Sequence, residues 1–295
     1  EQAKLVRRAV RVCKADLVTQ MVKELPKLQG IMGRYYAQKS GEAESVCHLI
    51  EQHYWPRFPG DALPVYDEAK VLGIADRLDT LACCFITHLM PTGSADPWGV
   101  RRLVRGLFDL INTGPFNLEL GVKNAVTLVT EKKGEPDVAP LLAFLSLRLK
   151  QYWLELSYAF DLIDAVLGNA IQHPGTAQLT LKTLTNWRKT DPDDFKRIVQ
   201  TAVRVKRLAQ QGKGETDTAL FAQLEEKIAW ATFEKADFSK RSHSLTDFCH
   251  AMTTYFEAVM VMADDVAIRQ NRLAFLSAVD AKFSQLANFE KVVIL

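Results

Sequence analysis

The stretch that decides the fold class runs from Asp67 to His88 and reads DEAKVLGIADRLDTLACCFITH. Its apolar residues are dense, and the next strong turn signal comes only after it, at Pro91. A segment of this length is too long for an ordinary strand, and its pattern is typical of a helix. We therefore predict one long helix that is central in its domain and buried on most sides.

Helical periodicity continues before and after this segment. From Val6 to Leu25 apolar residues recur at steps of three and four positions, which predicts a helix that Pro26 ends. Asp96 is placed to cap a helix that has Pro97 at its first position. The other helices expected in this part of the chain cover Gln29–Ala37, Glu42–Tyr54 and Pro97 to about Ile111.

Two clusters of turn-forming residues divide the chain, Asn112–Pro115 and Lys132–Pro136, with room for a short helix between them. A second run of helical segments follows, and strand signals are nearly absent. We predict an all-α protein with two helical-bundle domains, residues 1–115 and 137–295, joined by a linker at 116–136. The second domain is expected to contain helices at about Asp137–Leu156, Ala159–Gly168, Ala177–Arg188, Pro192–Gln210, Thr218–Ala236, Ser244–Met262 and Val266–Phe289.

The composition is that of a folded protein, with 48% hydrophobic and 24% charged residues. The 37 Lys and Arg against 35 Asp and Glu give a net charge of only +2, so any nucleic-acid contact must come from local patches. Five cysteines without a CxxC pair argue against a disulfide framework or a zinc ribbon and favour a reducing compartment. No apolar run is long enough to span a membrane. The opening Glu1–Lys4, without Met, indicates a fragment of a longer chain.

Positive charge is concentrated in two places. The first predicted helix places five cations along one face: Lys4, Arg7, Arg8, Arg11 and Lys14. The segment from Lys182 to Lys213 contains nine Lys and Arg residues but only three aspartates, and Trp187 is next to Arg188 in the sequence. Each cluster has two interpretations. It is either a solvated helix face, with Trp187 in the core in the second case, or a surface that binds phosphates and stacks bases.

Catalytic signals are weak by comparison. The chain contains no glycine-rich phosphate loop, GxSxG, HExxH or Walker lysine, and its six histidines are scattered. Asp76 and Asp79 share one face of their helix and could bind a metal, but we favour salt bridges with Arg or Lys. We therefore predict no catalytic and no metal-binding residue in this chain.

Several longer motifs carry a family resemblance. In order, they are Cys13-Lys-Ala-Asp-Leu-Val-Thr-Gln-Met-Val22, Leu28-Gln-Gly-Ile-Met-Gly-Arg-Tyr-Tyr-Ala37, His53-Tyr-Trp-Pro-Arg57, Gly73-Ile-Ala-Asp-Arg-Leu-Asp-Thr-Leu81, Pro91-Thr-Gly-Ser-Ala-Asp-Pro97 and Arg101-Arg102. The chain closely resembles the C-terminal half of the β subunit of bacterial-type glycyl-tRNA synthetases. The segments Phe256–Asp265 and Ile268–Leu273 resemble the end of that subunit, so the resemblance covers essentially the whole chain.

The resemblance implies a fold and a function. The first domain would be an HD-like helical domain, related to metal-dependent phosphohydrolases, and the second a helical anticodon-binding domain. The expected partners are tRNA(Gly) and the α subunit, or a fused α region, whose class II site uses ATP and Mg²⁺ to activate glycine. No cofactor is expected in this chain, and neither DNA nor a membrane is an expected partner. The expected location is the cytoplasm of a bacterium or an organelle.

The resemblance also implies roles for individual residues. The residues expected on the acceptor side of the tRNA are Arg7, Arg11, Lys14, Arg34, Arg101 and Arg102. Those expected on the anticodon side are Arg188, Arg197, Arg204, Lys206 and Arg207, although the family more often has Asn where this chain has Arg207. Arg269, Asn271 and Arg272 could support the preceding helix corner, which we favour, or reach RNA. Asp264 or Asp265 is expected to cap the helix after that corner.

The HD-like domain departs from an active hydrolase. The His-Asp doublet corresponds to Ala15-Asp16, so the imidazole is missing, and Asp16, Asp76 and Asp79 would be survivors of the acidic ligands. We therefore expect neither hydrolase activity nor tight metal binding. Two alternatives to tRNA binding stay open: an active HD-type phosphohydrolase, and a structural module that docks the α subunit.

Overall fold

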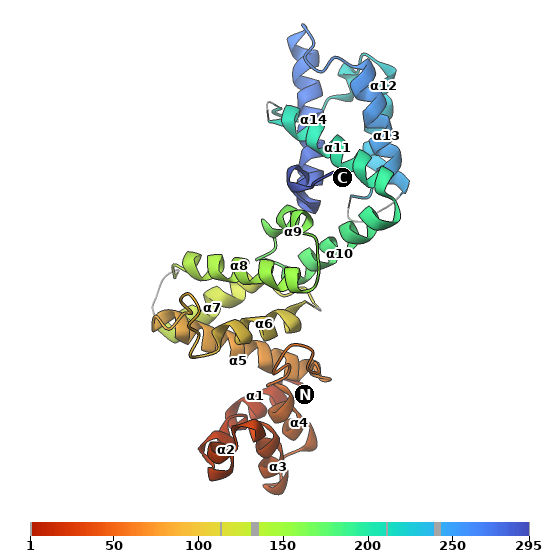
Figure 1. Ribbon diagram of the computed structural model, residues 1–295. Helices are drawn as coiled ribbons and strands as arrows, with labels where there is room; N and C mark the ends of the chain where they lie inside the picture. Colours follow the sequence, from red (N-terminus) through yellow and green to blue (C-terminus); the bar gives the residue numbers. More distant parts are fainter. Residues whose placement is uncertain (1, 113, 131–135, 211, 239–242, 295) are drawn as a thin grey trace. The chain divides into compact units, whose positions relative to one another are not determined.

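The computed structural model describes residues 2–112, 114–130, 136–210, 212–238 and 243–294 (Figure 1). Within these ranges the chain forms fourteen α-helices and four short 3₁₀ helices, with no β-strand. The all-α prediction is confirmed. None of the described helices combines the length and apolar character needed to cross a bilayer. The chain divides into two compact units, Glu1–Tyr152 with Ile171–Thr176, and Trp153–Ala170 with Ala177–Leu295.

These units divide the chain differently from the two predicted domains. Residues 1–115 lie wholly in unit 1, but helix α7 (Leu118–Thr130) and most of α8 (Ala139–Glu155) also belong to it. The α8 residue Tyr152 connects α8 to the end of α6, because its hydroxyl donates to Asp109 at 2.8 Å and accepts from Asn112 at 2.8 Å. Residues 132–135 of the second predicted break lie outside the described residues.

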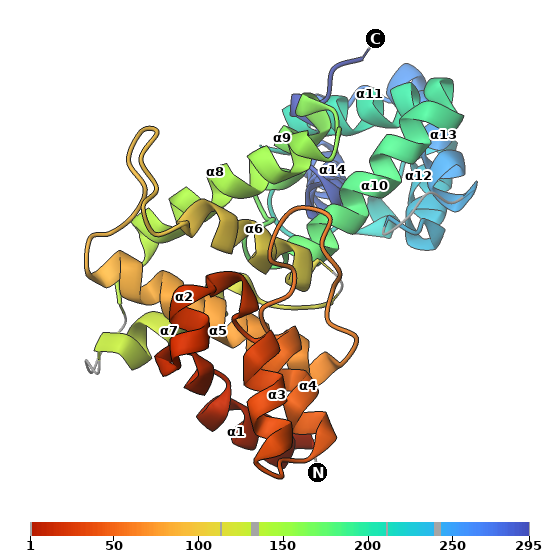
Figure 2. The same ribbon diagram turned by 60° about the horizontal axis from the view of Figure 1, so that its bottom comes forward.

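Unit 1 begins with short helices packed on a longer one. In Figures 1 and 2, α3 and α4 lie side by side, and α5 packs against α6 and α7. The core between α1, α4 and α5 is built from residues such as Ala9, Ile50 and Leu72, all nearly inaccessible to solvent. The elements of unit 1 up to α6 are α1 (Gln2–Val12), η1 (Ala15–Val18), α2 (Gln20–Glu24), η2 (Pro26–Leu28), α3 (Ile31–Lys39), α4 (Glu44–Gln52), α5 (Asp67–Ile86) and α6 (Val100–Ile111).

The single helix predicted over Val6–Leu25 is wrong, because it is broken in the middle. Helix α1 ends at Val12, and Thr19 starts a new helix, α2, by accepting a hydrogen bond from the amide of Val22 through its side chain. Between them the Asp16 carboxylate turns inward and binds backbone amides of a later segment. A tertiary contact therefore overrides the local helical periodicity.

The decisive segment does form one long helix, α5, but one stripe of it is exposed. Leu72, Leu78 and Leu81 are buried, whereas Val71 and Asp79 lie on the solvent side. The predicted burial on most sides is therefore too extensive, and α5 is an ordinary amphipathic helix.

The N-cap of α6 is Gly99, so the predicted N-cap position of Asp96 is wrong, but the Asp96 side chain still binds the start of the helix. Its two carboxylate oxygens accept from the amides of Val100 and Arg101, at 2.8 and 3.0 Å. The first helical residue is Val100, after Gly99 in a left-handed conformation, so Pro97 lies before the helix. The carboxylate still satisfies the amides that a helix start leaves without partners.

Unit 2 is a bundle in which α11 packs on α14 and α12 on α13. Its centre is a cluster of aromatic rings that includes Trp230, Phe233, Phe248 and Phe275, with ring centroids 5.7–5.8 Å apart. The elements that lie wholly or mostly in unit 2 are α9 (Phe160–Leu167), α10 (Pro174–Thr190), α11 (Pro192–Ala209), η3 (Thr218–Leu220), α12 (Leu224–Lys235), α13 (His243–Ala258), α14 (Val266–Leu286) and η4 (Phe289–Lys291). The segments predicted as single helices over Thr218–Ala236 and Val266–Phe289 each comprise an α-helix and a separate 3₁₀ turn.

Candidate nucleic-acid interface

The cationic face of α1 contains both exposed and paired side chains. Arg7 and Arg11 are exposed, and neither has a carboxylate partner among the described residues. Arg8 binds Glu42 across to the start of α4, and Lys14, which lies beyond the end of α1, binds Asp76 of α5. Arg7 and Arg11 are therefore the cations of this face best placed to meet a phosphate.

Two further acceptor-side candidates have structural partners. Arg34 binds Glu51 through its Nη1 at 2.8 Å. Arg101 donates to the carbonyl oxygens of Gly93 and Ser94 and so holds the turn before α6. Arg102, one residue further along, is exposed and has no carboxylate partner among the described residues.

On α11 the anticodon-side candidates also separate into two groups. Arg204 and Arg207 are exposed, and Arg204 lies over the ring of Phe256, 4.2 Å from its centroid, while donating to the Phe256 carbonyl at 3.3 Å. Arg197 donates to His250 at 2.6 Å and approaches Asp194 at 3.5 Å. Arg197 is therefore held by residues of α11 and α13, although 35% of its side chain is exposed.

The remaining anticodon-side candidates form ion pairs and hydrogen bonds within unit 2. Lys206 binds Glu290 at 3.3 Å and Asn288 at 3.2 Å, next to the C-terminal turn. Arg188 forms a two-pronged ion pair with Asp161, in which Nη1 lies 3.1 Å from Oδ1. Burial alone would raise the pKa of Asp161, but hydrogen bonds from Arg188 and the Val293 amide lower it below its usual range.

Trp187 cannot stack on a base in this structure. Only 1% of its surface is exposed, and its ring meets that of Phe195 edge-on at 6.0 Å. The interpretation of Trp187 as an RNA-stacking residue is therefore wrong, and the alternative, a core tryptophan, is correct.

The degenerate HD position is built around one buried carboxylate. Asp16 is 1% exposed, and its Oδ2 accepts from the amides of Gly30 at 2.7 Å and Gly33 at 3.1 Å. Its Oδ1 has no hydrogen-bond partner among the described residues. A Cβ at Gly33 would lie 3.1 Å from that carboxylate and 2.8 Å from Ile50, so the close approach requires glycine.

The other acidic survivors do not gather around Asp16 as a metal site. Asp76 is bound to the ammonium group of Lys14, and Asp79 is exposed. His53 is fully buried, with Nδ1 2.8 Å from the Ile50 carbonyl, and burial lowers its pKa. In the described part of the chain no group of three His, Cys, Asp or Glu residues is arranged to hold a metal ion.

A cavity of about 440 Å³ opens beside Asp16, between α1 and α3. Its walls include the paired Arg8 and Glu42 as well as Tyr36. The size falls within the range of small-molecule sites. The charges that line it are mixed, so it does not by itself select an anion.

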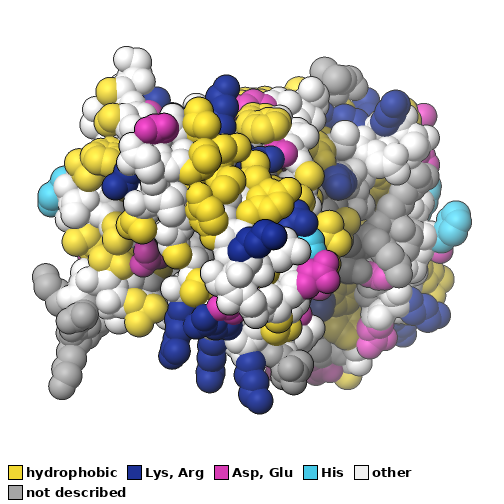
Figure 3. All heavy atoms as spheres, turned by 90° about the horizontal axis from the view of Figure 1, so that it is seen from below, with side chains coloured by type: hydrophobic (Ala, Val, Ile, Leu, Met, Phe, Trp, Pro, Cys, Tyr) yellow, Lys and Arg dark blue, Asp and Glu magenta, His cyan; other side chains and the backbone are white. Residues whose placement is uncertain are grey.

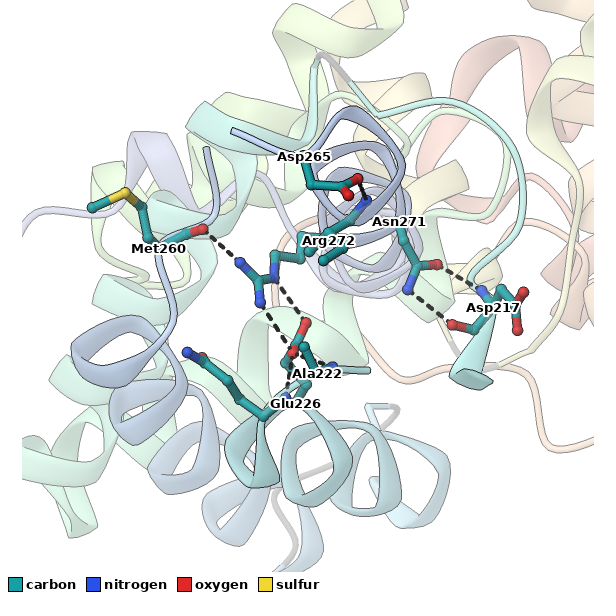
Figure 4. Close-up of polar contacts among 9 residues, drawn as sticks. Asp217, Ala222, Glu226, Met260, Asp265, Asn271 and Arg272 are labelled. Carbon is teal, nitrogen blue, oxygen red and sulfur yellow. Dashed lines mark hydrogen bonds and ion pairs between the residues drawn. The ribbon is translucent and has the colours of Figure 1, made fainter. Parts of the chain in front are cut away.

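The corner before α14 is a second feature that the sequence singled out, and Figure 4 shows its contacts. Arg272 donates to both oxygens of Glu226, at 2.8 and 3.1 Å, and to the Met260 carbonyl at 2.8 Å. Asn271 exchanges two hydrogen bonds with the backbone of Asp217, at 2.7 and 2.8 Å. Asp265 caps α14, as predicted.

These contacts settle how the three polar residues of α14 are used. Arg269 donates to the Ala263 carbonyl at 2.9 Å, and Arg272 and Asn271 are 5% exposed. All three therefore support the corner, which confirms the interpretation we favoured. Hydrogen bonds from Arg272 and two amides hold the pKa of Glu226 below its usual range, although burial opposes them.

One group of cations was missed as a site. Arg57, Arg102 and Arg105 line a small hollow between the loop after α4 and helix α6. Arg57 lies in one of the family motifs, and Arg102 was expected to bind RNA, but nothing local in the sequence places them together. Their proximity depends on the tertiary structure, so a single sequence does not reveal it.

Comparisons with known proteins agree with the resemblance seen in the sequence. Residues 1–168 match the family model described as glycyl-tRNA synthetase beta subunit. Over 99% of its length the chain is 34% identical to the glycine–tRNA ligase beta subunit of Shouchella clausii and 36% identical to that of Myxococcus xanthus. It spans only 45% of the length of each relative. The family match covers more than half of the chain, and the chain therefore belongs to the glycyl-tRNA synthetase β-subunit family.

Proposed function

We propose that this chain is a tRNA-binding part of a glycine–tRNA ligase and that it holds tRNA(Gly) while glycine is attached at a class II site elsewhere in the enzyme. The observation that carries the proposal is a set of exposed guanidinium groups without carboxylate partners in the described chain, Arg7 and Arg11 on α1 and Arg204 and Arg207 on α11. Guanidinium groups of this kind bind phosphates with two hydrogen bonds.

The two units take different parts of the tRNA in this proposal. Arg7 and Arg11 face the acceptor arm, and Arg204 and Arg207 face the anticodon arm. The ring of Phe256 already orients Arg204 from below, which reduces the entropy lost when a phosphate or base edge binds. ATP and Mg²⁺ act at the α subunit or fused α region, the expected partner of this chain, and not on its residues.

Filter binding with tRNA(Gly) across a KCl series tests the proposal. We expect steep salt dependence, and we expect Arg7→Gln/Arg11→Gln to weaken binding of an acceptor minihelix and Arg207→Gln to weaken binding of an anticodon stem–loop. The control variant is Lys27→Gln/Lys39→Gln, which removes two exposed cations that are not among the residues proposed to bind RNA. Absent or salt-insensitive binding by the wild-type chain would refute the proposal.

Docking of the α region is a second candidate, favoured by exposed apolar residues. Val18 is 76% exposed and Leu25 53%, and Met21 between them is 42% exposed, all around helix α2. Figure 3 shows hydrophobic side chains gathered on one face beside Lys and Arg side chains. Such patches mark protein contacts when they are contiguous. A pull-down with the α subunit, without tRNA, should be lost in Val18→Glu/Met21→Glu if this face is the docking site.

The hydrolase alternative has less support. The carboxylate of Asp16 is bound by two backbone amides, and that of Asp76 by a lysine ammonium group. Both acids are therefore occupied by donors from the protein itself. Nucleotide hydrolysis assays with Mn²⁺ distinguish this alternative from RNA binding.

A further inference from the structure

The hollow beside α6 is lined by three arginines, one of which, Arg57, is paired with Asp61 just outside the lining. Arg57, Arg102 and Arg105 line it, and Asp109 is the one carboxylate in its lining. Its enclosed space is about 10 Å³, which is room for about one water-sized group. The hollow therefore has room for a single oxygen atom of an anion.

The segment from His53 to Pro56, which leads into the hollow, is held by a buried cation. Arg77 is 7% exposed, and its guanidinium donates to the carbonyl oxygens of His53, Tyr54 and Pro56, each at 3.0 Å. It also donates to the carbonyl oxygens of Trp55 and Gly73. Because Arg57 follows this segment directly, its backbone position is set before any ligand arrives.

The three lining cations differ in what already holds them. Arg57 donates through Nε to Asp61 at 3.1 Å while its side chain is 40% exposed. The guanidinium of Arg105 lies over the ring of Tyr152, 5.4 Å from the centroid. Arg102 is exposed, and its guanidinium lies near Gly99 at the start of α6. Arg57 and Arg102 are therefore the two exposed arginines of the lining.

An aromatic side chain is exposed at the mouth of this hollow. Phe58 lines it and is 57% exposed. Exposed rings next to arginines are the surface that an unpaired base and its phosphate require.

We propose that this hollow binds one backbone phosphate of an RNA strand, between Arg57 and Arg102, with the adjacent unpaired base stacked on Phe58. This site rests on the proposed function and deepens it, because it assigns a single-stranded segment of the bound tRNA to unit 1. Asp109 also lines the hollow, and its negative charge disfavours a second phosphate there.

The test uses fluorescence anisotropy with labelled tRNA(Gly) across a KCl series. Loss of one phosphate contact should weaken binding of Arg57→Gln/Arg102→Gln by about tenfold or more at low salt and should reduce the slope of log Kd against log salt by about 0.7–0.9. Phe58→Ala should weaken binding by about fivefold or more, with the slope unchanged, because stacking involves no charge. The effect of Phe58 distinguishes a polynucleotide from free phosphate, which needs no stacking.

The control Lys27→Gln/Lys39→Gln removes the same charge from unit 1 and should bind like the wild type. Thermal melts verify that each variant is folded, which the exposure of Arg57, Arg102 and Phe58 favours. If the arginine variant binds no worse than the lysine control, the hollow is not a phosphate site, although tRNA binding stands. If the wild-type chain itself binds no tRNA, both proposals fall.

Discussion

Removing Arg272 should strongly destabilise unit 2, because its partner would be left as an isolated buried charge. Glu226 is 1% exposed and accepts four hydrogen bonds, two from Arg272 and two from the amides of Ala222 and Gln223, both at 2.9 Å (Figure 4). In Arg272→Met only the amides remain. Breaking a buried pair in this way costs about 3–5 kcal/mol, a large part of the total stability of a domain.

A second substitution shows whether the unpaired charge of Glu226 causes the loss of stability. In Arg272→Met/Glu226→Gln the amide oxygen can still accept from the two backbone amides, and no unpaired charge remains. We expect the double variant to recover about 2 kcal/mol relative to Arg272→Met alone. Urea denaturation followed by circular dichroism measures both free energies of unfolding.

The pH dependence of stability tests the same reasoning independently. The pKa of Glu226 is lowered in the folded wild type, so its contribution is complete above the ordinary Glu pKa of about 4.3 and is lost as pH falls through the folded pKa. Without Arg272, burial should raise the folded pKa above the unfolded one, so Arg272→Met should become less defective as pH falls from 7 to 5. A loss below about 1 kcal/mol, or a defect that grows on acidification, would refute the reasoning.

Three further predictions concern unit 1. Asp16→Ala leaves two buried amides without acceptors and should cost about 2–4 kcal/mol in urea unfolding, whereas Asp16→Asn, which keeps an acceptor, should cost about half as much; equal costs would contradict this account. Arg77→Met removes the donor for five carbonyl oxygens and should lower stability by at least about 3 kcal/mol, measured by thermal melting; an unchanged melting temperature would argue against it. Because burial lowers the pKa of His53, wild-type stability should fall as pH drops below about 6.5, and His53→Gln should flatten that decline in urea titrations; parallel curves would exclude His53 as the cause.

The helices of this protein were predictable where local signals agree with packing. The start of α11 at Pro192 was predicted from the sequence, and so was a cap at Asp264 or Asp265, which Asp265 provides at the start of α14. The break at Cys13–Thr19 was not predictable, because it depends on a carboxylate that reaches amides fourteen and seventeen positions away. Local periodicity holds no information about such a contact.

The candidate site was harder to predict for the same reason. Charge density located the cationic helices correctly, but the partners of many cations lie far along the chain. Arg188 meets an aspartate 27 residues earlier, and Lys206 bonds to Asn288, 82 residues later. A single sequence cannot distinguish these anchored cations from Arg7 and Arg207, which remain exposed.

The carbonyl contacts of Arg77 also depend on two glycines, Gly73 on α5 and Gly106 on α6. A Cβ at Gly73 would lie 3.0 Å from its Nη1, and one at Gly106 would lie 3.0 Å from its Nε. A change at either glycine displaces the guanidinium and frees the segment that ends at Pro56. Gly73, Arg77 and Gly106 are therefore structurally coupled, although they lie on two helices. A substitution of Gly106 on α6 should shift the loop that follows α4.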